Sequence, residues 1–298
     1  VFARFKRNDN YKVHFLTGTD EHGLKIQKSA EANNLEPLTY CNKISSTFKD
    51  LAKKLSLSND DFIRTTEKRH VDVVQNILQK VYDKGDIYED NYEGLYSVSE
   101  ERFITEKEAD SGDFRDIKKL KEKNYFFKMS KYQEKLISHI ENNSKFIQPV
   151  HRKNEVLGFL KSPLNDLCIS RPKSRLNWGI ELPFDSDYVT YVWFDALINY
   201  VSALGFDSDE KKYNTYWPAN LHLIGKDILT THSVYWPTML LSAGIKLPKT
   251  IFAHGWWLND QSKMSKSVGN VIDPFELIKS YGVDPVRFYL MKEMVLGQ

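Results

Sequence analysis

The chain has 298 residues, of which 41% are hydrophobic and 28% are charged, and its formal net charge is +2. This composition is typical of a globular enzyme with a sizeable core in one large domain or two, and no apolar run reaches the roughly 18 residues that a membrane-spanning helix needs. A nearly neutral charge neither indicates nor excludes a nucleic-acid partner.

The two cysteines, Cys41 and Cys168, are far apart in the sequence. Their number and spacing argue against a disulfide framework and a cysteine-rich zinc site, so they are interpreted as structural thiols in a reducing cytoplasm. The first eleven residues carry basic side chains, but no apolar stretch follows, so no secretory signal is expected there. The chain opens inside a helical pattern without a Met, which suggests that its ends are cut.

Short β-prone runs alternate with helical patterns along most of the chain. In the clearest helical pattern, Val71, Val74, Leu78 and Val81 lie on one face, and Gly85 follows the last turn. Strands alternating with helices predict an α/β fold with a doubly wound parallel sheet. Strands are expected at residues 13–17, 167–170, 188–193, 221–224 and 250–253, and helices at 24–33, 37–54, 68–84, 131–142 and 152–160.

Residues 87–150 differ from the rest, because tyrosines alternate with charged residues and residues 107–123 are highly charged. This stretch is interpreted as a small inserted domain. The chain is therefore divided into four parts: the first half of a catalytic nucleotide-binding domain (1–86), an inserted connective domain (87–150), the second half of the catalytic domain (151–262), and a lysine-containing loop with the start of a helical segment (263–298).

The run Lys263-Met264-Ser265-Lys266-Ser267 indicates a phosphate-binding loop. Two ammonium groups and two hydroxyls can meet a polyphosphate, and small residues let such a loop close over it. A solvated lysine loop is the alternative interpretation.

A second run, Thr17-Gly18-Thr19-Asp20-Glu21-His22-Gly23, follows a predicted strand. Asp20 could hold a substrate ammonium there, or it could cap the following helix.

These motifs resemble the class I aminoacyl-tRNA synthetases, whose signature loop is Lys-Met-Ser-Lys-Ser, and within them the methionyl-tRNA synthetase family. The resemblance covers nearly the whole chain, including Tyr125-Phe126-Phe127-Lys128 and Asn177-Trp178-Gly179-Ile180. It implies a Rossmann-like core, and activation of L-methionine by ATP with Mg²⁺ on the phosphates. Transfer to tRNA(Met) would follow, with no membrane partner.

The resemblance also implies roles for individual residues. Asp20 would receive the amino group of the amino acid, with Arg171 supporting it, and Lys266 with Lys263 would stabilise charge on the departing pyrophosphate. Tyr200 and His232 would supply donors near the methionine sulfur. The implied methionine pocket consists of Trp193, Ala196, Tyr200, Ile228, His232 and Trp236. The implied ATP site consists of Gly225 and Asp227 near the ribose, Lys226 facing phosphate, His254 and Trp257 near the adenine, and Lys266.

The chain departs from the family pattern at several points. Leu197 stands where proline is common, and no His-Ile-Gly-His-type motif occurs, since it is expected just before Val1. The anticodon-reading domain is expected beyond Gln298, so little activity is expected from this piece alone. The insert has no cysteines, with Ser97 where relatives can have one, so no zinc or other metal site is expected.

Two other functions stay open. One is a synthetase for leucine, isoleucine or valine, which share the lysine loop but have larger editing inserts than residues 87–150 provide. The other is a non-catalytic binding module that keeps the pocket without the reaction, which only the missing motif favours. Pyrophosphate exchange with each amino acid would separate them.

Overall fold

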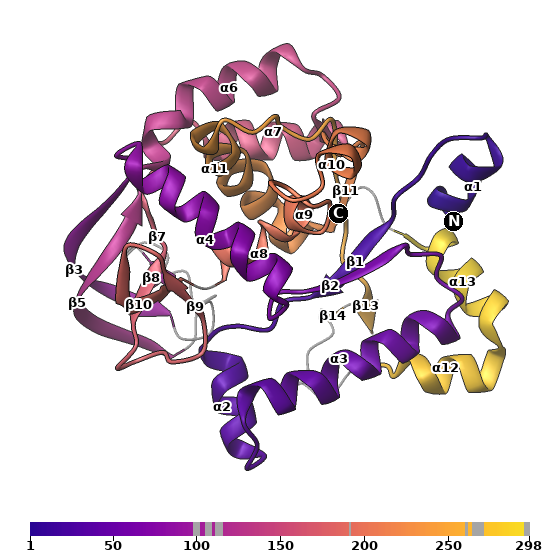
Figure 1. The fold of residues 1–298 in the computed structure, drawn as a ribbon. Coiled ribbons are helices and arrows are strands. Elements are labelled where there is room, and N and C mark those ends of the chain that lie inside the picture. The colour runs from indigo at the N-terminus through magenta and orange to yellow at the C-terminus, as the bar shows by residue number, and fades with distance from the viewer. Residues whose placement is uncertain are drawn as a thin grey trace.

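Two groups of parallel strands form the frame that carries the site (Figure 1). In the first, β1 (Leu16–Thr19) pairs with β2 (Asp61–Arg64). In the second, β12 (Ile251–His254) lies between β11 (His222–Gly225) and β6 (Ile147–Gln148). The carboxyl ends of parallel neighbours lie at one edge, where α/β sheets present ligand-binding groups. The computed structural model describes residues 1–97, 102–104, 109–110, 116–190, 192–259, 262–263 and 271–294.

Gly18 allows β1 and β2 to approach closely. A Cβ atom at this position would lie 2.0 Å from the carbonyl oxygen of Ile63 on β2, which is far inside van der Waals contact. The pairing of β1 with β2 therefore requires glycine at position 18, and this pairing positions the residues that follow.

The helices of the first third flank these strands. The amphipathic α4 (Lys68–Asp83) buries the face that contains Val74, Ile77, Leu78 and Val81, and it ends before Gly85, whose φ is +76°. The side chains of this face join the main hydrophobic core. The other helices here are α1 (Phe2–Asn8), α2 (Leu24–Ala32) and α3 (Pro37–Lys54).

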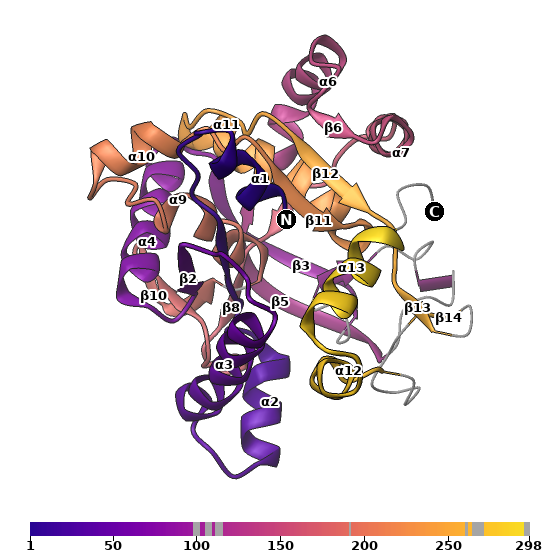
Figure 2. The ribbon, with the colours of Figure 1, turned by 90° about the vertical axis from the view of Figure 1, so that its right-hand side faces the viewer.

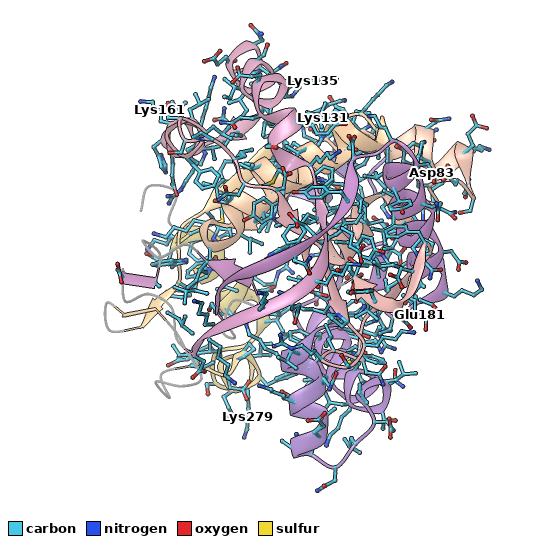
Figure 3. The ribbon with its side chains drawn as sticks, turned by 90° about the vertical axis from the view of Figure 1, so that its left-hand side faces the viewer. Asp83, Lys131, Lys135, Lys161, Glu181 and Lys279 are labelled. Atoms are coloured by element: carbon cyan, nitrogen blue, oxygen red, sulfur yellow. The ribbon has the colours of Figure 1, made fainter. Side chains whose placement is uncertain are left out.

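Antiparallel sheets occupy the region of β3 and β5, at the left of Figure 1. The sheet order is β4-β3-β5-β7, and a second sheet has the order β8-β10-β9. Figure 3 shows β3 and β5 crossing this side of the molecule as a long twisted ribbon. The sheets of the described chain are therefore mixed, within an α/β fold. The bounds are β3 (Ile87–Ser97), β4 (Arg102–Ile104), β5 (Ile117–Phe127), β7 (Leu167–Cys168), β8 (Ser170–Pro172), β9 (Ile180–Leu182) and β10 (Asp185–Thr190).

Short helices follow the strands of the second half and cover the core beside α4 (Figures 1 and 2). The apolar α11 (Trp236–Ala243) is nearly all buried and packs against α4 and α6. The remaining elements are η1 (Met129–Tyr132), α6 (Gln133–Asn142), α7 (Val150–Phe159), α8 (Trp193–Ala196), α9 (Asn199–Ser202), α10 (Glu210–Tyr216), η2 (Lys226–Ile228) and η3 (Thr231–Tyr235).

The last described elements are β13 (Leu258–Asn259), β14 (Ser262–Lys263), α12 (Pro274–Tyr281) and α13 (Val283–Lys292). Of these, α12 and α13 lie at the right of Figure 1, where α12 contacts α3. The Lys54 ammonium lies 4.9 Å from the centre of the Phe275 ring, and Arg287 donates to the carbonyl of Leu55 at 2.5 Å. None of the described helices is long and apolar enough to cross a membrane.

Most of the predicted elements are present, with shifts at their ends. The strand expected at 188–193 was wrong at its carboxyl end, because β10 ends at Thr190 and α8 begins at Trp193. The helix expected at 131–142 begins as the 3-10 turn η1 before α6. The strand β10 ends early because the chain turns at Val192, whose φ is +59°.

Candidate functional site

The carboxyl ends of β11 and β12 bring together residues that the sequence analysis placed in the ATP site. Gly225 and His254 are register partners at the ends of these strands. A Cβ atom on Gly225 would lie 2.7 Å from Oδ1 of Asp227, so a side chain at this position would displace that carboxylate. The Lys226 ammonium lies 3.9 Å from the centre of the Trp256 ring, a cation–π contact that holds its charge at this edge.

The other predicted residues of this region lie farther along the chain. The Trp257 ring lies 6.3 Å from that of Tyr289 on α13, and thus faces the last helices. Lys263 pairs through its backbone with Leu258 in the β13–β14 hairpin. Lys266 lies outside the described residues, so its predicted role at the pyrophosphate stays a prediction.

An aromatic pocket is centred on Tyr200, and we define it by Tyr200, His222, His232 and Trp236. The Tyr200 ring centre lies 4.1 Å from that of His222, 5.7 Å from that of His232 and 5.9 Å from that of Trp236. Trp236 is fully buried and donates from Nε1 to Nε2 of His222 at 3.2 Å. Three elements therefore meet here: α9, the first residue of β11, and the η3–α11 segment, whose π-helical turn carries His232. Such turns are frequent at functional sites.

Hydrogen bonds fix the tautomer of His232. Its Nδ1 lies 2.9 Å from the carbonyl oxygen of Ile228, so this nitrogen carries the proton and donates. Its Nε2 then accepts from the Tyr200 hydroxyl, 2.7 Å away. Burial lowers the pKa of His232 to about 4 and that of His222 to about 3, and it raises the pKa of Tyr200. The pocket is thus a neutral, aromatic environment.

This geometry limits the donors that Tyr200 and His232 can offer to a ligand sulfur, and their predicted role there stays a prediction. The single hydroxyl proton of Tyr200 points to His232, and the single N–H of His232 points to Ile228. If the tautomer changed so that Nε2 donated to Tyr200, the hydroxyl would be released, but Nδ1 would face the Ile228 carbonyl without a proton. The pair can therefore offer at most one donor, the Tyr200 hydroxyl.

Trp193 and Ala196, also predicted for the pocket, lie on α8 just before α9. The Trp193 ring lies 6.5 Å from that of Tyr235. Trp193 Nε1 is buried without a hydrogen-bond partner in the part of the chain that the structure describes. A buried donor of this kind is costly in a protein without ligand, and it is available to a ligand atom.

The turn after β1 carries Asp20, which is exposed, and is fixed by its neighbour Glu21, which is buried. Arg64 donates to Glu21 from Nε at 2.7 Å and from Nη2 at 2.8 Å, and Thr66 donates at 2.6 Å. Burial alone would raise the pKa of Glu21, but the bonds from Arg64, Thr19 and Thr66 lower it overall. This bidentate ion pair ties the turn to the end of β2 and holds Asp20 in place.

A second buried carboxylate, Asp195 on α8, lies between two histidines. His22 donates from Nδ1 to Oδ2 of Asp195 at 2.7 Å, and His70 donates from Nε2 to Oδ1 at 2.8 Å. The Nδ1 atom of His70 lies 2.8 Å from the Ser202 hydroxyl on α9. We call His22, His70, Asp195 and Ser202 the Asp195 network.

Within this network, His22 and Asp195 each shift the pKa of the other toward its charged form. Burial alone would lower the pKa of His22, but Asp195, with smaller effects of Asp20 and Glu21, raises it overall. Burial would likewise raise the pKa of Asp195, but His22 and His70 lower it. The network therefore holds an anion in the core with its charge compensated.

The sequence analysis missed Glu21, Arg64, His22, His70 and Asp195. One signal was present: Asp195 is an acidic residue inside the apolar run from Val192 to Ile198. Because burying an unpaired charge is costly, such a residue predicts a buried partner. Its partners could not be identified, since they lie 125 and 173 residues away.

Arg171, predicted to support Asp20, is buried on β8. Its Nη1 atom lies 3.0 Å from the sulfur of Cys168 and 2.7 Å from the carbonyl oxygen of Ser170, and its Nε lies 3.7 Å from Glu122. Its predicted support of Asp20 stays a prediction. Among the described residues, no group of three or more His, Cys, Asp or Glu side chains is placed to hold a metal ion.

Comparisons with known proteins identify relatives over the whole chain. A family model described as tRNA synthetases class I (M) matches residues 1–113 and 115–298. The methionine–tRNA ligase of Rickettsia bellii is 49% identical over 301 residues, and that of Clostridium acetobutylicum is 52% identical over 303 residues. Both matches cover 100% of this chain, but only 59% and 47% of those proteins. The chain thus spans about half the length of these relatives.

Solved structures agree with this result. Mycobacterium tuberculosis methionyl-tRNA synthetase bound by methionyl-adenylate superposes with a TM-score of 0.91 at 46% identity, over 97% of this chain and 58% of that one. The apo form of the same protein gives a TM-score of 0.82 at 41% identity, over 99% of this chain and 57% of that one.

Proposed function

Because the chain belongs to the methionine-type class I tRNA synthetases, we propose that its full-length protein activates L-methionine with ATP and transfers it to tRNA(Met). The observation that carries this proposal is the neutral aromatic pocket around Tyr200, whose His222 lies on the strand that ends at Gly225. Its support is the 46% identity to a synthetase whose structure holds methionyl-adenylate.

The proposed fold is that of one doubly wound parallel core, in which the β1–β2 pair and the β11–β12–β6 group belong to the same nucleotide-binding unit. We propose the domain division 1–86, 87–150, 151–262 and 263–298 on the same basis. The pairing of β6 with β12 shifts one of these boundaries, because Ile147 and Gln148 are strand partners of the second half, so the proposed insert ends before residue 147 and not at residue 150.

The proposed reaction has two steps. A carboxylate oxygen of methionine attacks the α-phosphorus of ATP, the bond to the bridging oxygen of pyrophosphate breaks, and methionyl-adenylate forms. A ribose hydroxyl of the tRNA then takes the acyl group and releases AMP. Displacement at phosphorus depends on positioning and charge stabilisation more than on a protein nucleophile. We assign the charge on pyrophosphate to Lys266 and Lys263, with Mg²⁺ on the ATP phosphates.

Methionine recognition divides between two chemistries in this proposal. Asp20, exposed at the end of β1, receives the ammonium group, supported by Arg171. The side chain enters the pocket of Trp193, Ala196, Tyr200, Ile228, His232 and Trp236. An unbranched, polarizable thioether suits aromatic walls, and the neutral state of His232 avoids burying a charge beside it.

The nucleotide is assigned to the carboxyl ends of β11 and β12. Gly225 and Asp227 approach the ribose, Lys226 faces phosphate, and His254 and Trp257 border the adenine. The close approach of Gly225 to Asp227 supports the first assignment, because it leaves the carboxylate beside a bare backbone. We propose that the enzyme acts in the cytoplasm, without zinc and without a membrane partner.

Methionine-dependent pyrophosphate exchange by the full-length protein tests the proposal, with leucine, isoleucine and valine as competitors. Exchange that is fastest with methionine supports it. Faster exchange with a branched amino acid would keep the family and refute the substrate. Methionine binding without exchange would establish a binding module instead.

A further inference from the structure

We propose that Asp195 is a positioning residue for methionine binding, which holds the turn that carries Asp20 and the pocket helix α8 in one fixed geometry. The inference rests on the proposed function. It adds a residue that contacts neither the phosphates nor, in our assignment, the substrate itself, and that acts through His22 and His70.

Asp195 joins three parts of the chain by its two oxygen atoms. Oδ2 accepts from His22, which lies in the turn after β1, and Oδ1 accepts from His70, on the first turn of α4. The carboxylate is fully buried, and both imidazoles are nearly so. A carboxylate with each oxygen bonded to a different element cannot shift without breaking a charge-assisted bond.

The turn after β1 is held on its other sides as well. The indole N–H of Trp178 donates to the carbonyl of Glu21 at 2.5 Å, and the amide of Gly23 donates to the carbonyl of Trp178 at 3.1 Å. Glu21 is tied to Arg64. None of these contacts reaches the pocket helix. The bond from His22 to Asp195 connects this turn to α8.

The backbone before α8 makes such an anchor necessary. Val192 has φ +59° and ψ −109°, a conformation that a β-branched residue seldom adopts. Its carbonyl accepts from the amide of Ala196 at 2.6 Å, which closes the first turn of a helix only four residues long. A short helix after a strained residue does not hold its own orientation. We therefore infer that Asp195, which lies on α8 between Trp193 and Ala196, fixes the orientation of this helix.

Asp86 provides a comparison, because it is also fully buried and bonded on both oxygens. It accepts from Lys131 at 2.5 Å, from Ser242 at 2.7 Å and from Tyr132. These bonds join the end of α4 to η1 and α11, and none involves a residue assigned to methionine or ATP. Removing the charge of either aspartate leaves its buried partners without their counter-charge and destabilises the fold, so a loss of substrate affinity in the Asp195 variant alone reports positioning.

The experiment uses the full-length protein and measures methionine affinity by calorimetry, and KM and kcat by pyrophosphate exchange. We expect Asp195→Asn to raise the methionine KM and dissociation constant about tenfold, with a smaller change in kcat and an unchanged ATP KM. His22→Leu should act in the same way. His22→Asn, whose amide nitrogen can lie where Nδ1 lies, should restore most of the affinity.

Asp86→Asn is the matched control, and it should lower the melting temperature without changing the methionine KM. The His22 pair keeps the test valid if Asp195→Asn does not fold. A folded His22→Leu variant with wild-type methionine affinity would overturn the inference, as would an equal loss of affinity in Asp86→Asn. If wild-type protein supports exchange and the variants bind normally, only the inference fails; if wild-type protein binds no methionine, the proposed function fails with it.

Discussion

In the aromatic pocket, His222 and His232 are enclosed by rings, whereas in the Asp195 network His22 faces a buried carboxylate. Burial lowers the pKa of the pocket histidines to about 3 and about 4. It would do the same to His22, yet Asp195 raises that pKa overall. One carboxylate therefore decides whether a buried histidine is kept neutral or favours its charged form.

In the proposed function, the two regions contribute differently to substrate binding. A neutral pocket suits an apolar thioether, because no charge has to be desolvated beside it. A charged network suits positioning, because its bonds are directional and strong at short distance. Neither region, in our assignment, reaches the phosphates, whose charge is left to the lysine loop. The four predictions below test this division, from the largest expected effect to the smallest.

The lysine loop should affect the rate without affecting either histidine region. Lys266→Ala should lower the pyrophosphate-exchange rate of the full-length protein about 10²- to 10³-fold, because the ammonium meets charge that develops in the transition state. Methionine affinity, measured by calorimetry, should stay close to that of the wild type. Lys279→Ala is the control, because Lys279 is an exposed lysine on α12, labelled in Figure 3. A wild-type exchange rate in Lys266→Ala would contradict the assignment.

Acid should destabilise the aromatic pocket. The pKa values of His222 and His232 are lowered from 6.5 to about 3 and about 4. Between these values and pH 6.5, the two histidines are protonated in the unfolded chain but neutral in the folded pocket. Stability from this source is complete above pH 6.5 and decreases as the pH falls toward 4, by on the order of 1 to 3 kcal/mol. Urea unfolding between pH 7 and 4 measures it, with His232→Asn as the comparison. An equal acid sensitivity in the variant would argue against His232 as a source.

The Asp195 network should respond to pH in the opposite direction. Since the pKa of His22 is raised above 6.5, its stabilisation is complete below that pH and is lost as the pH rises through the raised value. We expect about 1.4 kcal/mol per unit of pKa difference. The difference in unfolding free energy between wild type and His22→Leu, followed from pH 5 to 9, should shrink as the pH rises. A constant difference would show that His22 stabilises only by packing.

The smallest effect concerns the sulfur of the ligand. Full-length protein should activate methionine best, then norleucine, then leucine, with isoleucine and valine last, because a branched side chain fits the slot poorly. Sulfur contacts contribute about 0.3 to 1.5 kcal/mol each, so methionine and norleucine should differ modestly.

Tyr200→Phe should reduce that difference, since the hydroxyl is the one donor that the Tyr200–His232 pair can release. Exchange kinetics with both amino acids measure it. Unchanged discrimination in Tyr200→Phe would exclude the hydroxyl as the sulfur donor.

Several elements could be predicted because their signal is local. The apolar face of α4 follows from residues three and four apart, and its end follows from Gly85. The strands β11 and β12 were predicted to within a residue, because each is a short β-prone run before a polar turn. The end of β10 was not, because the turn at Val192 depends on what α8 packs against.

The sequence by itself determined which residue types are available for chemistry: the lysine loop from Lys263, the Asp20 turn, and the aromatic residues around Tyr200. The tertiary structure decided how they are protonated and held. His22 and Asp195 are 173 residues apart, and His70 and Asp195 are 125 apart, so no periodicity relates them. Whether a buried histidine faces a carboxylate or an aromatic ring depends on the path of the chain, and this contact sets both its pKa and its role.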